Sequence, residues 1–108
     1  MKKICYAIML QSQLGPRAGE LMLQEAPPVV SGYLGLLGHR NRFSGRVLAA
    51  GKYLISGEIR STVDAEPYDA IFTIQDGHLS GGVVTRRGCW DLIGVRSDNA
   101  SLAEEDGF

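Results

Sequence analysis

Hydrophobic and polar residues alternate along most of the chain, in short blocks that are separated by turn-forming residues. In one block Tyr53, Ile55 and Ile59 share a parity with Gly57, and the polar Ser56 has the opposite parity. A period of two places successive side chains on opposite faces of a strand. No segment combines helix-capping residues with a 3.6-residue period. The pattern therefore predicts an all-β protein.

A small residue recurs at the centre of each block, every 11 to 13 positions. The series consists of Ala7, Gly19, Gly32, Gly45, Gly57, Ala70, Gly81 and Gly94. A period of about 12 residues suits one strand plus one tight turn. The small residue generally has the parity of the apolar residues, so we expect it on the buried face, where it lets a sheet coil tightly.

Turn-forming residues lie between these centres, and Asp76-Gly77 is the strongest hairpin signal among them. The frame predicts eight strands, over residues 3–11, 17–25, 29–37, 42–49, 52–61, 67–75, 78–86 and 89–97. Short turns make them an up-and-down antiparallel meander, and closure into a small barrel removes the open edges. Strands in a barrel are tilted, and their register is sheared around the barrel. Eight small residues at one level of the sheet are therefore incompatible with a barrel that closes without a register offset. Either some turns shift the register, or the sheet is a partly open roll.

The length of 108 residues allows one domain. We expect residues 1–97 to form a single β-barrel domain. Residues 98–108, which include Glu104, Glu105 and Asp106, are expected to form an acidic, frayed C-terminal tail.

The net charge of −1 gives no indication of a nucleic-acid partner or of an anionic membrane surface. No apolar run approaches the 18 residues of a membrane span. The first apolar run, residues 4–10, suits a strand better than a signal peptide. We therefore expect a cytoplasmic protein in which Cys5 and Cys89 stay reduced. Their spacing matches no zinc motif, and we expect no cofactor.

Alternate turns of a meander lie at the same end of the sheet. The turns near residues 12–17, 37–42, 61–66 and 86–88 bring most of the arginines to one end. The candidate ligand-binding residues there are Arg17, His39, Arg40, Arg42, Arg86 and Arg87. Arginine suits bidentate recognition of carboxylate or phosphate. A solvated basic rim is the alternative interpretation.

In architecture the predicted meander resembles the calycin-type barrels, nearest to the eight-stranded avidin-like ones. That resemblance implies a closed barrel with a small ligand. The lipocalin Gly-x-Trp motif is absent near the first strand, and Trp90 is the single indole available to an avidin-like site. The stretches 36–39, 43–45 and 55–57 (Leu-Leu-Gly-His, Phe-Ser-Gly and Ile-Ser-Gly) also resemble small uncharacterised bacterial proteins, which imply no function.

Two functions are weighed first. The leading hypothesis is a non-enzymatic barrel that binds a small anionic or amphipathic ligand at its arginine-rich mouth, because small inward residues leave space. The alternative is a structural or protein-interaction module that forms a homo-oligomer through its outer face. That face is predicted to carry Met22, Tyr33, Ile71, Val84 and Val95.

An enzyme is the third and least favoured reading, because no catalytic motif is present. Its polar groups would have to come from inward positions of the barrel. The predicted inward candidates are Tyr53, Tyr68, Cys5 and Thr85.

Overall fold

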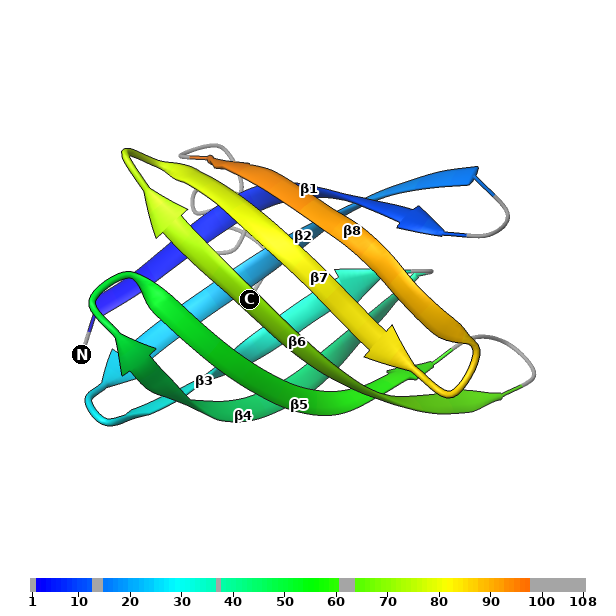
Figure 1. The fold of residues 1–108 in the computed structure, drawn as a ribbon, viewed down its shortest axis with the longest axis horizontal. Helices are drawn as coiled ribbons and strands as arrows, with labels where there is room; N and C mark the ends of the chain where they lie inside the picture. Colours follow the sequence, from blue (N-terminus) through cyan, green and yellow to red (C-terminus); the bar gives the residue numbers. More distant parts are fainter. Residues whose placement is uncertain (1, 13–14, 37, 61–63, 98–108) are drawn as a thin grey trace.

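The computed structural model describes residues 2–12, 15–36, 38–60 and 64–97, and within them eight antiparallel strands form one closed barrel. Each strand pairs with its neighbours along the chain, and the last strand pairs with the first (Figure 1). The strands are β1 (Lys2–Ser12), β2 (Gly15–Ala26), β3 (Val29–Leu36), β4 (His39–Ala49), β5 (Lys52–Arg60), β6 (Ala65–Gln75), β7 (His78–Thr85) and β8 (Gly88–Arg96). The predicted all-β meander that closes into a barrel is confirmed, and each strand lies within three residues of its predicted bounds.

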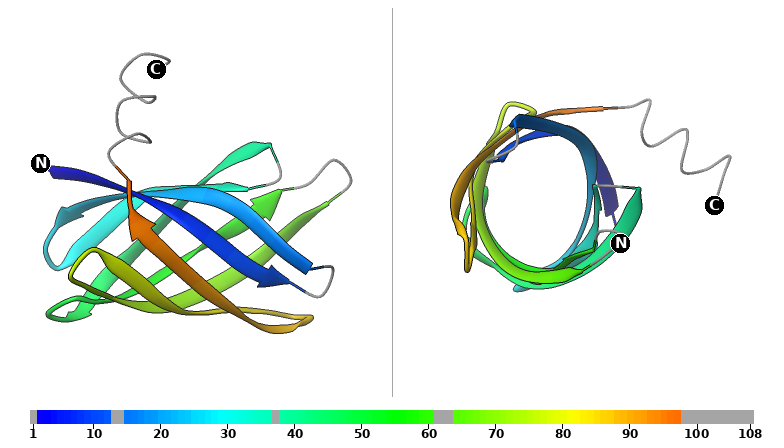
Figure 2. Two further views of the ribbon diagram at one scale, coloured as in Figure 1. Left: turned by 90° about the horizontal axis from the view of Figure 1, so that it is seen from above. Right: turned by 90° about the vertical axis from the view of Figure 1, so that its right-hand side faces the viewer.

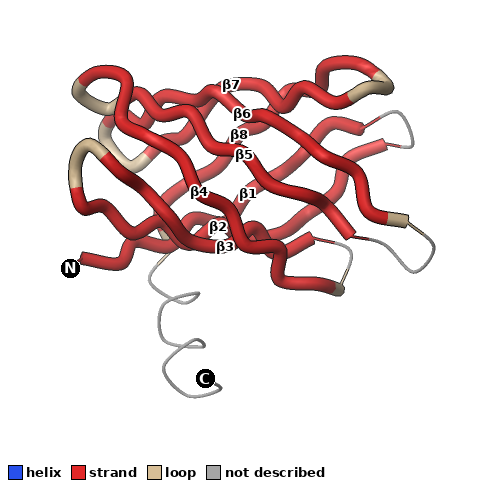
Figure 3. The backbone as a smooth tube through the Cα atoms, turned by 90° about the horizontal axis from the view of Figure 1, so that it is seen from below, coloured by secondary structure: helices blue, strands red, loops and turns tan. Residues whose placement is uncertain are grey.

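The strands are steeply tilted, and they form a ring when the barrel is viewed end-on (Figure 2). Successive connections alternate between the two ends of the barrel (Figure 3). At the β6–β7 turn, Asp76 and Gly77 have φ of 52° and 77°, as the type I′ hairpin turn requires. No helix in the described part of the chain could cross a membrane. The predicted acidic tail, residues 98–108, lies outside the described residues.

The interior of the barrel is filled by one apolar cluster to which every strand contributes. Large rings supply much of its volume, and those of Tyr53 and Phe72 stack with centroids 5.5 Å apart. Trp90 is partly buried and packs against the same cluster. The largest fully buried side chains among the described residues are Phe72, Leu21, Leu23, Leu34, Ile55, Leu79, Leu92, Val30 and Val83.

The inward glycines let neighbouring strands approach closely. Gly45 pairs with Val30 on one side and with Ile55 on the other. A Cβ at Gly45 would collide with the backbone carbonyl oxygen of Leu54, and a Cβ at Gly81 would collide with that of Ile71. The glycines thus lie beside large residues, not beside one another, which allows the barrel to close. At these positions the missing side chain is replaced by the adjacent strand, so it leaves no cavity there.

Strand β1 has the opposite phase to the one that the repeat predicts. Ala7 is exposed, and its predicted inward place is taken by Ile8, which pairs with Gly19 and with Gly94. Ile8 fits because both neighbouring strands present a glycine to it. The same phase turns Cys5 outward, so its predicted inward position is wrong. Cys5 is nevertheless buried, in a small cluster on the outside of the barrel.

Candidate ligand-binding site

Side chains on the outside of β1 to β4 are aligned in rows, because these four strands pair in continuous register. Outward side chains alternate with those that fill the core. The central row consists of Cys5, Met22, Tyr33 and Arg42. On one side of it lies the row of Ala7, Glu20, Gly35 and Arg40. On the other side lies the row of Lys3, Gln24, Ser31 and Ser44.

The central row contains a second apolar cluster, which is separate from the barrel core. Cys5, Met22 and Tyr33 are only 4%, 7% and 8% exposed, although they point away from the interior. A barrel wall without an outer layer normally leaves such positions accessible to solvent. Burial on this scale marks the outside of β1 to β3 as a distinct surface.

Two interactions fix the ring of Tyr33 on this surface. Its hydroxyl donates a hydrogen bond of 3.3 Å to Oε1 of Glu20. The guanidinium carbon of Arg40 lies 4.9 Å from the centre of the ring, which is within the range of a cation–π contact. The ring and the charge therefore form one platform with an apolar side and a cationic side.

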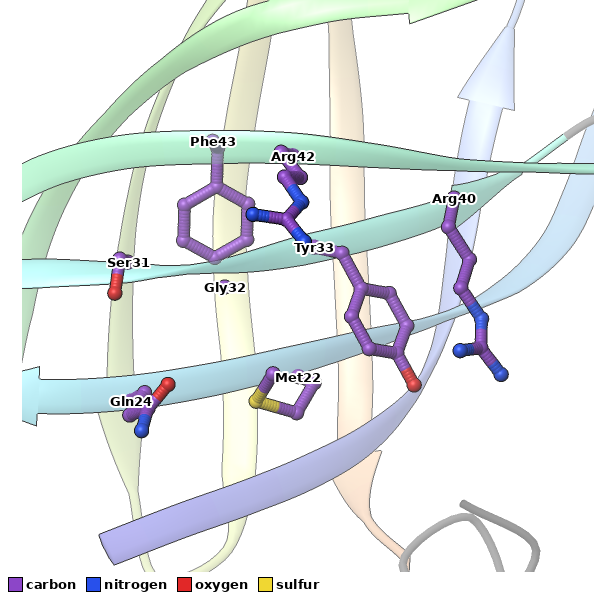
Figure 4. A pocket seen from close by; sticks show the side chains of 8 residues that line it. All are labelled: Met22, Gln24, Ser31, Gly32, Tyr33, Arg40, Arg42 and Phe43. Atoms are coloured by element: carbon purple, nitrogen blue, oxygen red, sulfur yellow. The ribbon is translucent and has the colours of Figure 1, made fainter. Parts of the chain in front are cut away.

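A groove of about 430 Å³ lies over this platform (Figure 4). In the view of Figure 4, Arg40 and Arg42 lie on opposite sides of Tyr33, and Gln24 and Ser31 lie at the other end of the groove. The groove is lined by Met22, Gln24, Ser31, Gly32, Tyr33, Arg40, Arg42 and Phe43. It therefore combines two cations, neutral hydrogen-bonding groups and apolar surface, which suits an anion that carries an apolar group.

A neighbouring hollow of about 420 Å³ shares Arg40 with the groove. It brings in His39, at the start of β4, together with Glu20 and Leu36. The two adjoining hollows thus include three of the predicted site residues, His39, Arg40 and Arg42.

The other predicted site residues lie elsewhere on the same end of the barrel. Arg86 and Arg87 are in the β7–β8 turn, with Nε atoms 3.9 and 3.2 Å from the Glu66 carboxylate. Arg17 is exposed in β2 and lines neither of the two hollows. Whether all six residues form a ligand site stays a prediction, and the geometry favours the part around Arg40 and Arg42.

The inward polar groups of the described residues lie at both ends of the barrel. Tyr53 donates a hydrogen bond to Oε1 of Glu25 near one end of the barrel. Burial, followed by this hydrogen bond and the charge of Glu25, raises the pKa of Tyr53. Burial also raises the pKa of Tyr6, with Arg96 opposing the shift and Glu25 adding to it. Thr85 is at the opposite end, where it accepts a hydrogen bond of 3.0 Å from the backbone N–H of Arg87.

Tyr68 is an exception among these interior groups. It is 3% exposed, and its hydroxyl finds no hydrogen-bond partner among the described residues. Burial raises its pKa. A buried hydroxyl without a partner costs stability. The packing of the described residues therefore explains the ring of Tyr68 but not its hydroxyl.

Asn41 also points inward, and it has a structural role. Its Nδ2 donates to the carbonyl oxygens of Leu34 and His39, at 3.0 and 3.3 Å. Its Oδ1 accepts from the backbone N–H of Arg60 at 2.9 Å. Asn41 therefore joins β3, β4 and β5 at the arginine-rich end, beneath the outward Arg40 and Arg42.

Sequence reasoning missed the roles of Gln24 and Ser31 in the groove. The repeat places them on the outer face, but only the β2–β3–β4 register shows that they lie in one row. Among the described residues, no group of three histidine, cysteine or acidic side chains is arranged to hold a metal ion. The sequence matches no protein-family model. A search of curated proteins likewise finds no match.

Proposed function

We propose that this protein is a non-enzymatic binding barrel that takes a small anionic ligand with an apolar part into the groove over β2, β3 and β4. The observation that carries the proposal is the placement of Arg40 and Arg42 around the fixed ring of Tyr33. An anion between the two guanidinium groups gains charge-assisted hydrogen bonds. Its apolar part gains contact with Tyr33 and Met22.

The eight-stranded closed barrel is consistent with a calycin-like barrel. We further propose that the protein is related to avidin-like binding proteins and is cytoplasmic. The proposed site differs from an avidin-like site in one respect. Aromatic rings fill much of the interior, so the proposed ligand binds on the outside of the wall.

The experiment is a thermal-shift and calorimetric titration of the full chain with 2-naphthoate, with inorganic phosphate in a parallel arm. We expect 2-naphthoate to raise the melting temperature, since a ligand at 100 times its Kd stabilises a protein by about 2.7 kcal/mol. Arg42→Gln should weaken binding roughly 10- to 100-fold, because a hydrogen bond to a charged group contributes about 1.5–3 kcal/mol.

Arg87→Gln is the matched control, because Arg87 is an arginine of the same end that is paired with Glu66. It should leave the affinity for 2-naphthoate unchanged. If neither anion binds, or if Arg87→Gln weakens binding as much as Arg42→Gln, the groove is not the site.

A second candidate function, self-association, is favoured by a different surface. Four outward apolar side chains on β6, β7 and β8 are 47% to 50% exposed, namely Ile71, Val84, Ile93 and Val95. Four half-exposed apolar side chains on three adjacent strands favour an interaction face. The test is light scattering at increasing concentration, with Ile93→Lys as the disrupting variant. A monomer at all concentrations would remove this candidate.

A further inference from the structure

Strands β4 and β5 pair along only part of their length. Toward the arginine-rich end of the barrel their ladder ends at the pair of Phe43 and Gly57, although both strands are described to their ends. From Arg42 and Glu58 onward, β4 continues to pair with β3, and β5 continues to pair with β6. The barrel wall therefore opens between β4 and β5 at this end.

The side chain of Asn41 lies in this opening. Its Oδ1 accepts a hydrogen bond of 2.9 Å from the backbone N–H of Arg60 on β5, and its Nδ2 donates one of 3.0 Å to the carbonyl oxygen of Leu34 on β3. A side chain thus takes the place of a direct backbone bond between β4 and β5. Asn41 is only 3% exposed, so the separation of the two strands belongs to the packing of the barrel.

A hollow of about 430 Å³ lies at this opening. Arg42 lines both this hollow and the groove over Tyr33, so the two meet at that residue. Two arginines and one glutamate make up the charged part of its lining. The hollow is lined by Asn41, Arg42, Phe43, Ser44, Ser56, Gly57, Glu58 and Arg60.

The two strands bring opposite charges to the hollow, Arg42 from β4 and Glu58 from β5, and both residues are exposed. Among the described residues, ion pairs join Glu66 to Arg86 and Arg87, and neither Arg42 nor Glu58 takes part in one. The separation of the strands therefore leaves a guanidinium and a carboxylate at one hollow, each able to bind a ligand group of the opposite charge.

The chemical groups follow one another across the strands in a fixed order. Met22 on β2 pairs with Tyr33 on β3, and Tyr33 pairs with Arg42 on β4. Glu58 lies on the next strand, just beyond the end of the β4–β5 ladder. The order is apolar, cationic and then anionic, and two steps of roughly 4.8 Å, about 10 Å in all, separate the strands of Tyr33 and Glu58. An α-amino acid with an apolar side chain offers the complementary groups within one small molecule.

We propose that the ligand is an α-amino acid with a large apolar side chain, which lies over Tyr33 and Met22. Its carboxylate binds at Arg42, and its ammonium group binds at Glu58. The inference rests on the proposed function, because the carboxylate and the apolar group use the same groove. It goes further by adding the hollow between β4 and β5 and by making a positive charge a required part of the ligand.

Two ligands that differ only in the ammonium group test this inference. The full chain is titrated by calorimetry at pH 7 with 3-(2-naphthyl)-L-alanine and with 3-(2-naphthyl)propionate. We expect the amino acid to bind about tenfold tighter or more, because a hydrogen bond between charged groups contributes about that factor to an affinity. The amine 2-(2-naphthyl)ethylamine, which lacks the carboxylate, should bind more weakly than the amino acid.

Glu58→Gln isolates the contribution of the carboxylate on β5. In this variant the amino acid should lose its advantage over naphthylpropionate, whose own affinity should stay the same or rise. Asp91→Asn, which neutralises an exposed carboxylate on β8, is the matched control and should leave the ratio of the two affinities unchanged. Because the readout is a ratio within one variant, a general loss of stability does not imitate the expected result.

The affinity for naphthylpropionate tests the proposed function, and the ratio tests the inference. Saturable binding of naphthylpropionate with no advantage for the amino acid would overturn the amino-acid ligand and leave the groove as an anion site. An advantage that persists in Glu58→Gln would also overturn it, because the ammonium group would then bind elsewhere. If neither carboxylate binds, or if the amine binds as tightly as the amino acid, both proposals fail.

Discussion

The outside of this barrel has two unlike faces built on the same wall. Over β1 to β3 the outward side chains of Cys5, Met22 and Tyr33 are 4% to 8% exposed. Over β6 to β8, Ile71 and Val84 are 47% and 50% exposed in equivalent outward positions. Both faces have outward apolar residues, so the alternation of the sequence does not distinguish them. The difference lies in what surrounds each one.

The first face has basic residues at its border and the end of the described chain at its edge. The second face differs in its polar residues. Among its described outward residues there is no aromatic ring flanked by two arginines, and the polar ones include Asp69, Asp91 and Thr73. We infer that the first face is built to hold an anionic group over an apolar surface. The second lacks this combination and carries carboxylates among its half-exposed apolar side chains.

The largest expected effect on stability tests whether the barrel wall is packed equally tightly beneath both faces. Gly45→Val on β4 and Gly81→Val on β7 should each destabilise the protein by about 3 kcal/mol, since overpacking typically costs about 1–3 kcal/mol and here the added atoms meet backbone. Urea denaturation monitored by circular dichroism provides the measurement.

The neighbouring outward serines are the controls for the glycine variants. Ser44→Val and Ser80→Val place the same side chain on the exposed side of the same strands, where a β-branched residue is favourable. We expect them to leave the denaturation midpoint unchanged or to raise it. More stable glycine variants would show that the assigned facing is wrong.

An intermediate effect separates the two outer faces. Met22→Gln introduces an amide of similar size into the buried cluster, and we expect a loss of about 2 kcal/mol, since burying an unpaired polar group costs about 1–3 kcal/mol. Val84→Thr makes a comparable polar change on the exposed face, and surface substitutions typically change stability by less than about 0.5 kcal/mol. Equal effects in chemical denaturation would remove the contrast between the faces.

The smallest effect at neutral pH concerns Tyr68, which lies inside the wall and belongs to neither face. Tyr68→Phe removes a hydroxyl that has no partner among the described residues, so stability at pH 7 should stay the same or rise by up to about 1 kcal/mol.

The pH dependence gives this variant a sharper readout. Because burial raises the pKa of Tyr68 in the folded state, the unfolded chain loses the proton first as the pH passes 10. Stability is therefore fully present below pH 10 and falls above it. In Tyr68→Phe the fall should be shallower, and an identical alkaline limb in both proteins would contradict the assigned environment.

Most of the fold follows from the sequence, because a half-buried strand has a two-residue period and a tight turn needs residues such as Asp76-Gly77. Strand β1 is where this reasoning failed. The repeat expected a small residue at Ala7, but packing depends on the partner strands, and Gly19 and Gly94 make room for Ile8. The phase of one strand is thus set by residues on two others.

The site was less predictable for a related reason. The sequence predicted that Arg40 and Arg42 lie at the same end of the barrel as Arg86 and Arg87. It could not show that the first pair borders an aromatic groove while the second engages Glu66. That distinction depends on the register across β2, β3 and β4, which aligns Met22, Tyr33 and Arg42.

Nuclear magnetic resonance mapping of 2-naphthoate on the isotopically labelled full chain tests the central claim most directly. We predict saturable shifts of backbone amide signals in β2, β3 and β4, centred on Tyr33 and Arg42, with no change at Ile71 or Val84. Shifts centred on β6 to β8 or on the Arg86–Arg87 turn, or no saturable shift at all, would contradict the assignment of the groove as the binding site.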